Sequence, residues 1–344
     1  MSTETTTPAK LTAKDFSSDQ DVKWCPGCGD YAILAQVQRV FPELNVPKEN
    51  YVFVSGIGCS SRFTYYMDTF GMHSIHGRAA AIASGVRATN RNLDVWLISG
   101  DGDSISIGGN HFIHLLRRNF EVKYLMFNNQ IYGLTKGQYS PLSEKGKNTK
   151  STPMGSVDEP FNPLELALGA KATFVARSLD RDPKHQQAMI KRAHAHKGTA
   201  FLEIYQNCPV FNDGAFFAFT EKETKIEECL FVEHGKPMIF GSNNSKGIKL
   251  DGFKPVIVDL AGGASANDLW IHDETDKVKA TILASLFDNP AMQPHNPRPF
   301  GVFYQETRAT YEDDLHAQIE LAKSKKGKVS LDRILSGDKT WTIA

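Results

Sequence analysis

Short apolar segments alternate with segments of helical periodicity through the middle of the chain. The apolar segments are residues 51–55, 94–99, 123–127, 172–176 and 200–205. Because they show little alternation between apolar and polar side chains, we expect strands buried on both faces, which is typical of parallel sheets. The intervening segments, such as residues 107–118, place their apolar side chains on one helical face. The pattern predicts an α/β fold, with a doubly wound, mostly parallel sheet covered by helices on both sides.

Three regions are expected along the chain. They are a polar N-terminal tail (1–20), the sheet domain (21–213) and a C-terminal extension (214–344). In the extension, two helical segments (265–286 and 311–323) are separated by polar stretches without clear periodicity. We therefore expect an irregular extension that wraps the sheet domain or a partner. Inside the sheet domain, residues 128–162 predict a long loop, and loops of this length are usually functional.

Composition excludes several classes of function. Lys and Arg together number 39, as do Asp and Glu, so the chain has no large basic field for nonspecific binding to nucleic acid or to an anionic membrane. No apolar run reaches 18 residues, and the first 15 residues are polar, which predicts neither a membrane span nor a signal peptide. The five cysteines, in a chain expected to be cytoplasmic, predict reduced thiols that bind metal or do redox work.

Two of the expected strands run directly into oxygen-rich turns. Gly-Asp-Gly-Asp (100–103) follows one strand and Asn-Asn-Gln-Ile-Tyr-Gly (128–133) follows the next. Parallel strands bring their carboxyl ends to one edge, where ligands bind. The Asp101 carboxylate, the Asn129 amide oxygen and the Ile131 carbonyl suit Mg²⁺, which prefers oxygen ligands and often completes its shell with phosphate. Either turn alone is equally consistent with an ordinary strand-end turn.

Four cysteines occupy positions from which they could converge on the same edge. Cys25 and Cys28 form a C-x₂-C turn before a helix, Cys59 follows the first strand, and Cys208 follows the last. Four thiolates satisfy either Zn²⁺ or a [4Fe–4S] cluster, and the residues alone leave both open. Cys229 has no partner in this arrangement and is expected to be an inert, half-buried thiol.

Five motifs taken in order resemble the β subunit of the 2-oxoacid:ferredoxin oxidoreductases, most of all its 2-oxoglutarate branch. They are CPGCG (25–29), SGIGCSSR (55–62), HGRA (76–79), GDGD (100–103) and NNQIYGLTKGQ (128–138). The resemblance covers about residues 24–213 and implies a sheet of the thiamine-diphosphate-binding type. It also implies thiamine diphosphate, Mg²⁺ and one [4Fe–4S] cluster as cofactors, the last favoured over zinc because an electron acceptor beside a thiamine centre makes chemical sense.

The resemblance also assigns roles to individual residues. Cys25, Cys28, Cys59 and Cys208 would ligate the cluster, and Asp101, Asn129 and Ile131 would hold Mg²⁺. The residues expected around thiamine diphosphate are Ile57, Gly58, Cys59, Ser60, His76, Gly100, Asp101, Gly102, Asp103, Asn129, Ile131, Gly133, Leu134 and Thr135.

Four residues are expected to be catalytic. Leu134 and Thr135 would approach the thiazolium end of the cofactor, and His76 would lie beside it. Arg62 stands where the 2-oxoglutarate branch often carries a basic residue, frequently Lys, that meets the distal carboxylate of the substrate; Arg binds a carboxylate with different geometry. For His76, a purely local role in capping or hydrogen bonding remains an alternative.

The implied reaction is CoA-dependent oxidative decarboxylation of 2-oxoglutarate to succinyl-CoA and CO₂ with reduction of ferredoxin, or the reverse carboxylation. The chain holds one sheet domain of this type, so an obligate α subunit is expected to supply the glutamate that activates thiamine, giving a heterodimer or a dimer of heterodimers. Pyruvate or another 2-oxoacid is an alternative substrate. A non-redox thiamine-dependent decarboxylase subunit with structural zinc, or a non-catalytic metal-binding scaffold, are the alternative functions.

Overall fold

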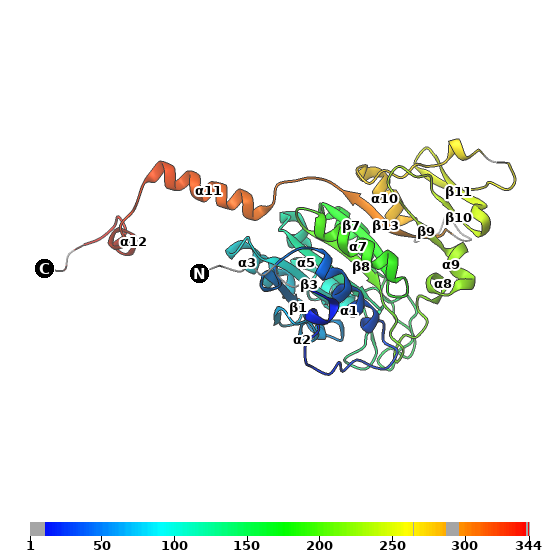
Figure 1. Cartoon of the computed structure of the whole chain (residues 1–344), viewed down its shortest axis with the longest axis horizontal. Helices are drawn as coiled ribbons and strands as arrows, with labels where there is room; N and C mark the ends of the chain where they lie inside the picture. Colours follow the sequence, from blue (N-terminus) through cyan, green and yellow to red (C-terminus); the bar gives the residue numbers. More distant parts are fainter. Residues whose placement is uncertain (1–10, 264, 287–295, 342, 344) are drawn as a thin grey trace, which may run out of the picture.

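The computed structural model describes residues 11–263, 265–286, 296–341 and 343, and an eight-stranded sheet lies at its centre (Figure 1). The strands lie in the spatial order β2 (Phe70–His73), β1 (Tyr51–Ser55), β3 (Asp94–Gly100), β4 (Val122–Asn128), β8 (Ala200–Tyr205), β7 (Phe174–Leu179), β13 (Arg298–Gln305) and β9 (Cys229–Phe231). From β2 to β7 all neighbours pair in parallel, whereas β13 runs antiparallel to β7. The predicted doubly wound, mostly parallel sheet is confirmed.

Helices cover both faces of this sheet because successive strand residues point to opposite sides. In β3, Val95 and Leu97 contribute to one apolar core while Trp96 and Ile98 contribute to the other. The first core is closed by α3 (Ala79–Thr89), α5 (Gly109–Arg118), α6 (Pro163–Gly169) and α10 (Lys277–Ser285), and the second by α1 (Gly29–Val40) and α7 (Pro183–Ala195). This two-sided burial explains the continuous apolar runs in the sequence.

The C-terminal extension is more regular than the sequence predicted. Its strands β9 and β13 complete the central sheet, and β10 (Ile239–Phe240), β11 (Lys246–Asp251) and β12 (Lys254–Asp259) form a small antiparallel sheet. The expectation of an irregular extension is therefore wrong for residues 229–259, 277–285 and 298–305. Pro299 and Gly301 interrupt the apolar run of β13 and obscured its strand pattern, although six of its eight residues are buried.

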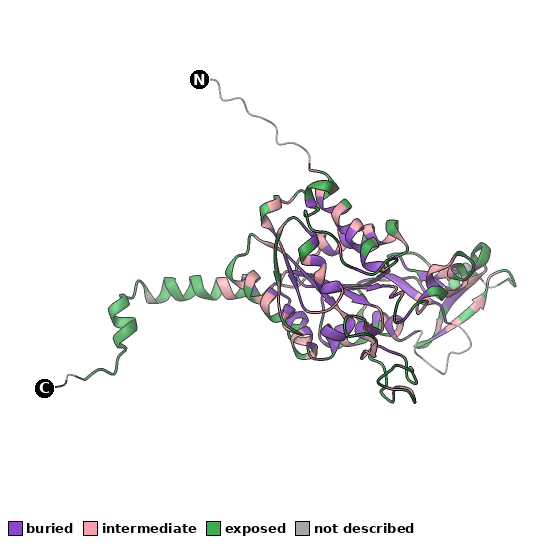
Figure 2. Cartoon of the chain, turned by 90° about the horizontal axis from the view of Figure 1, so that it is seen from below, coloured by how far each residue is buried: buried purple, intermediate pink, exposed green. Residues whose placement is uncertain are grey.

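The end of the chain projects away from the body of the protein as α11 (Tyr311–Lys326) and α12 (Leu331–Ser336) (Figures 1 and 2). The first turn of α11 is anchored, because the buried Glu312 accepts hydrogen bonds from Arg87 Nε at 2.8 Å and from the Glu121 amide at 3.0 Å. Neither α11 nor any other helix in the described ranges is both long and apolar enough to cross a membrane.

Short elements connect the larger ones. They are α2 (Phe63–Tyr66), α4 (Asp101–Ile105), α8 (Phe217–Thr220), α9 (Lys222–Glu228), and a hairpin of β5 (Ile131–Tyr132) and β6 (Gln138–Tyr139). The hairpin lies inside the segment predicted as a loop. It lies next to the carboxyl ends of β3 and β4, so its residues share a pocket with the turns that follow these strands.

A buried ion pair crosses the centre of the sheet. Arg177 on β7 lies opposite Glu203 on β8, and its Nε donates to Glu203 Oε2 at 2.6 Å, with both side chains almost fully buried. The other carboxylate oxygen of Glu203 accepts from Asn128 Nδ2 at 2.7 Å. The pair therefore supports the strand end from which the Asn-Asn turn leaves.

Replacing Arg177 by Met is expected to lower the free energy of unfolding by about 3–5 kcal/mol, because Glu203 would be left as an uncompensated buried charge. Denaturant-induced unfolding of the purified protein measures the loss. The matched control is Arg181→Met, since Arg181 pairs with Glu221 at the surface and should contribute less than about 1 kcal/mol. Equal effects of the two substitutions would contradict the prediction.

Candidate cofactor site

A pocket opens at the carboxyl edge of the sheet, where the turns after β1, β3 and β4 meet the β5–β6 hairpin. Its lining residues are Ile57, Gly58, Cys59, Ser60, His76, Gly100, Asp101, Gly102, Asp103, Asn129, Ile131, Tyr132, Gly133, Leu134 and Thr135. The structure therefore brings together every residue that the sequence placed around thiamine diphosphate. The convergence follows from parallel strand order, because each turn begins where a strand ends.

Tyr132 is the lining residue that the sequence analysis missed. Its hydroxyl donates to the Gly102 carbonyl at 3.1 Å, which ties the hairpin to the start of α4. The residue lies inside the NNQIYG motif, so its place in the motif was the available signal, but the aromatic side chain suggested core packing as readily as a pocket wall.

Asp101 is a buried carboxyl group at the base of the pocket. Its Oδ2 accepts a hydrogen bond from Ser140 Oγ at 2.5 Å, and burial away from water raises its pKa to about 7. The backbone of Asn129 lies close enough to this carboxyl group to act against the rise in its pKa, which places the two predicted Mg²⁺ ligands together. A dry carboxylate beside amide and carbonyl oxygens fits a hard divalent cation, whose charge would stabilise the ionised form.

Asp103 holds the side of the pocket that is formed by the turn before α3. Its Oδ1 accepts from the Gly77 amide at 2.9 Å and lies 2.9 Å from His76 Nδ1, while Oδ2 accepts from Ser99 Oγ at 2.9 Å. Asp103 thus holds the turn before α3 against the end of β3. His76 makes this local hydrogen bond and also lines the pocket. Its surroundings therefore agree both with a local hydrogen-bonding role and with a place beside the cofactor.

The close approach of Tyr132 requires glycine at position 102. A methyl group added to Gly102 would lie only 2.2 Å from Tyr132 Cε1. We expect Gly102→Ala to weaken binding of thiamine diphosphate by roughly five- to a hundred-fold, since overpacking costs about 1–3 kcal/mol. Titration of the cofactor in the presence of Mg²⁺ measures this loss.

Gly109→Ala is the control, because Gly109 opens α5 and an added methyl group there meets nothing within 4 Å. An unchanged affinity in the Gly102→Ala protein would show that Tyr132 moves aside without cost to the pocket.

Two of the four predicted cluster cysteines, Cys59 and Cys208, lie beside the β5–β6 hairpin, and Cys59 also lines the pocket. A methyl group on Gly133 would lie 3.5 Å from Cys59 Sγ and 3.6 Å from Cys208 Sγ, so both sulfurs contact one position. The Trp24 indole donates to the Cys59 carbonyl at 2.7 Å, which fastens the segment before the Cys25–Cys28 turn to the turn after β1. All four cysteines are free thiols.

Burial controls the ionisation of these thiols. Desolvation raises the pKa values of Cys28 and Cys208, and raises the pKa of Cys59 to about 12. Such thiols stay protonated near neutral pH unless a metal centre stabilises the thiolates. Within the described residues, however, no group of three or more His, Cys, Asp or Glu side chains is placed to hold a single metal ion.

Two other predicted residues fall outside the pocket lining. Arg62 is half-buried, and its Nε donates to the Tyr66 hydroxyl at 3.0 Å, so its role toward substrate stays a prediction. Cys229 is buried on β9, where its thiol donates to the Phe219 carbonyl at 3.4 Å. As expected from the sequence, Cys229 does not join the other four cysteines.

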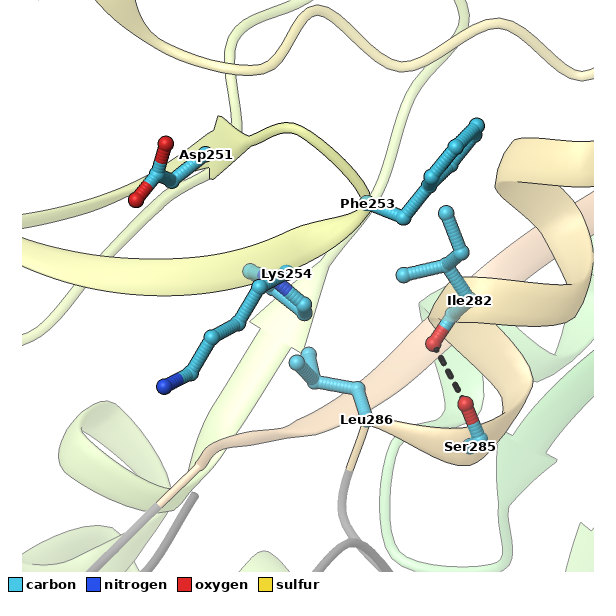
Figure 3. A pocket seen from close by; sticks show the side chains of 7 residues that line it. Asp251, Phe253, Lys254, Ile282, Ser285 and Leu286 are labelled. Carbon is cyan, nitrogen blue, oxygen red and sulfur yellow. Dashed lines mark hydrogen bonds between the residues drawn. The ribbon is translucent and has the colours of Figure 1, made fainter. Parts of the chain in front are cut away.

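A second cavity, of about 430 Å³, lies between the β11–β12 hairpin and α10 (Figure 3). Phe253, Ile282 and Leu286 line much of it, and the Ser285 hydroxyl donates to the Ile282 carbonyl within its own helix at 3.0 Å. Asp251 and Lys254 are the charged residues at this cavity. It offers no converging set of catalytic groups, so the carboxyl-edge pocket is the candidate site.

Comparison with known proteins agrees with this choice. Residues 56–204 match the family described as "Thiamine pyrophosphate enzyme, C-terminal TPP binding domain". The chain is 49% identical to 2-oxoglutarate oxidoreductase subunit KorB of Mycobacterium tuberculosis over 98% of this chain and 90% of that protein. It is 45% identical to 2-oxoacid:ferredoxin oxidoreductase 1, subunit beta, of Aeropyrum pernix over 55% of this chain and 60% of that protein.

A solved structure is also similar over almost the whole chain. It is the 2-oxoglutarate:ferredoxin oxidoreductase from Magnetococcus marinus with 2-oxoglutarate, coenzyme A and succinyl-CoA bound. The similarity has a TM-score of 0.76 and 31% identity, and covers 96% of this chain and 97% of the other. The chain belongs to the family of 2-oxoacid:ferredoxin oxidoreductase β subunits.

Proposed function

We propose that this chain binds thiamine diphosphate, Mg²⁺ and one [4Fe–4S] cluster, and with an α subunit converts 2-oxoglutarate and CoA to succinyl-CoA and CO₂ while reducing ferredoxin. One observation carries the proposal: the Asp101 and Asn129 turns and the Cys59 and Cys208 turns meet around Gly133. A cofactor held by the first pair of turns would lie next to a redox centre held by the second.

The oxygen-rich wall of the pocket, formed by the turns that carry Asp101 and Asn129, is suited to a metal-bound diphosphate. Asp101, Asn129 and the Ile131 carbonyl would hold Mg²⁺, which would neutralise the diphosphate. Gly102 lets Tyr132 close over the site, and Asp103 holds the turn that carries His76. When bound, thiamine diphosphate would supply the electron sink for decarboxylation, while these residues orient it and limit the access of water.

We favour a cluster over zinc at the cysteines because an electron acceptor beside a thiamine centre makes chemical sense, whereas zinc is redox-inert. Cys59 Sγ and Cys208 Sγ lie 3.5 Å and 3.6 Å from the position that a methyl group on Gly133 would take, which places two of the predicted ligands beside the pocket. The exposed Cys25 would leave one side of the cluster near the surface, where ferredoxin could approach.

The site needs a partner to be complete. The pocket-lining residues include Asp101 and Asp103 but no glutamate, and both aspartates are already hydrogen-bonded within this chain. Beside the pocket, Phe70, Met72 and Ile75 expose their apolar side chains on and just after the edge strand β2. An α subunit docked there would cover this apolar strip and could bring the activating glutamate to the pocket.

Purification of the anaerobic complex with its α subunit tests the proposal. We expect iron rather than zinc by elemental analysis, bound thiamine diphosphate, and CoA-dependent reduction of a low-potential dye. A panel of 2-oxoacids should then show the highest kcat/KM for 2-oxoglutarate. A strong preference for pyruvate would contradict the substrate assignment, and zinc without dye reduction would favour a non-redox decarboxylase.

A further inference from the structure

Gln206 lies between the oxygen-rich wall and the cysteine turns. It follows β8 directly, and its backbone N–H donates to the Asn128 carbonyl at 2.9 Å. The pairing of β8 with β4 therefore continues one residue beyond the strand. Its side chain is only 1% exposed. The backbone and burial together give this side chain a fixed place beneath both halves of the site.

The side-chain amide of Gln206 contacts both predicted metal sites. Its Oε1 accepts from Asn129 Nδ2 at 2.8 Å, while its Nε2 donates to Cys28 Sγ at 3.3 Å and to the Asn207 carbonyl. The reverse orientation of the amide would place oxygen against the Asn207 carbonyl and an NH₂ group against the NH₂ group of Asn129. The network therefore determines which end of the amide faces each site.

We propose that Gln206 is a positioning residue that joins the magnesium–diphosphate site to the iron–sulfur cluster, an inference that rests on the function proposed above. In the part of the chain that the structure describes, no hydrogen bond joins Asn129 directly to Cys28. Gln206 accepts from the first and donates to the second, so one side chain orients a ligand of each centre.

At the magnesium site, Gln206 determines which atom of Asn129 is offered to the cation. Because Asn129 Nδ2 is held by Gln206, Asn129 Oδ1 is directed to the opposite side, where it also accepts from the Ile131 amide at 3.1 Å. An amide oxygen has a second lone pair, which remains for Mg²⁺. Groups that orient a metal ligand in this way typically contribute 10–100-fold to metal affinity.

At the cluster, the same residue supplies a hydrogen bond to a ligand sulfur. An N–H···S bond stabilises the more negative, reduced state of a cluster and so raises its reduction potential. Loss of one hydrogen bond to a charged group should change the reduction equilibrium by about tenfold. For a one-electron couple this corresponds to a decrease of about 59 mV.

The test compares three variants of the anaerobic αβ complex. Gln206→Leu removes both interactions, and Gln206→Glu retains an oxygen facing Asn129 in either protonation state. Gln186→Leu is the matched control, because Gln186 is a buried glutamine on α7 whose side-chain nitrogen and oxygen have no hydrogen-bond partner in the described structure. The readouts are the midpoint potential of the cluster, followed by EPR, and the affinity for thiamine diphosphate with Mg²⁺.

We expect Gln206→Leu to lower the potential and to weaken cofactor binding at least about tenfold. Gln206→Glu should restore cofactor affinity but not the potential, and Gln186→Leu should change neither. An unchanged potential and an unchanged affinity in the Gln206→Leu complex would overturn the inference. If the Gln206→Leu complex does not assemble, an unchanged potential in the Gln206→Glu complex would overturn it. A wild-type complex without iron would instead overturn the proposed function.

Discussion

An Asp101→Asn chain is expected to assemble with its α subunit but to retain neither Mg²⁺ nor thiamine diphosphate. Asp101 is buried, and its desolvated carboxyl group is the anionic ligand that we propose for Mg²⁺. Losing several kcal/mol of charge stabilisation corresponds to a fall in kcat/KM of roughly a thousand-fold. Cofactor content after gel filtration and 2-oxoglutarate-dependent dye reduction measure the effect.

The control for this substitution is Asp94→Asn, at the amino end of the same strand. Asp94 lies 3.2 Å from His194, far from the carboxyl edge where the pocket opens. This variant should keep its cofactor and its activity. Retention of cofactor by the Asp101→Asn complex would show that the GDGD turn does not hold the cation, and would remove the main support for a magnesium–diphosphate site.

A Cys208→Ser chain is expected to lose the cluster while keeping thiamine diphosphate. Cys208 contacts the Gly133 position together with Cys59, and a serine hydroxyl is a poor ligand for iron–sulfur clusters. The iron content and the visible absorbance should fall to background, and dye reduction should decrease by more than about a hundred-fold, since loss of a ligand exceeds the effect of an outer-shell change.

Cys229→Ser is the matched control for this experiment. Cys229 is also buried and free, but it lies on β9 and donates to the Phe219 carbonyl, away from the other four cysteines. Its replacement should leave iron content and activity unchanged. A complex that lost iron on replacement of Cys229 but not of Cys208 would require a different set of ligands.

Much of the candidate site could be predicted because its residues follow strand ends. Cys59, Asp101 and Asn129 lie in turns after three parallel strands, and such turns meet at one edge whatever the details of helix packing. Motif spacing then indicated the chemistry of each turn. The pocket lining accordingly contains all the residues expected around the cofactor.

Other features could not be predicted because they depend on contacts between distant segments. Ser140 belongs to a segment expected to be a loop, yet its hydroxyl donates to Asp101, 39 residues away. The strand β13 pairs with β7 across more than a hundred residues of sequence. Local periodicity carries no information about such pairings, particularly where Pro and Gly weaken the strand pattern.

The sequence by itself determined the class of sheet, the edge at which ligands gather and the residue types available there, because all three follow from local periodicity and strand direction. Only the tertiary structure decided how the two halves of the site are joined. Gln206 is a single polar residue without a motif, and its function depends on burial that brings Asn129 and Cys28 to opposite ends of one amide. Hydrogen bonds of this kind are fixed by three-dimensional packing, which no short-range pattern in the chain encodes.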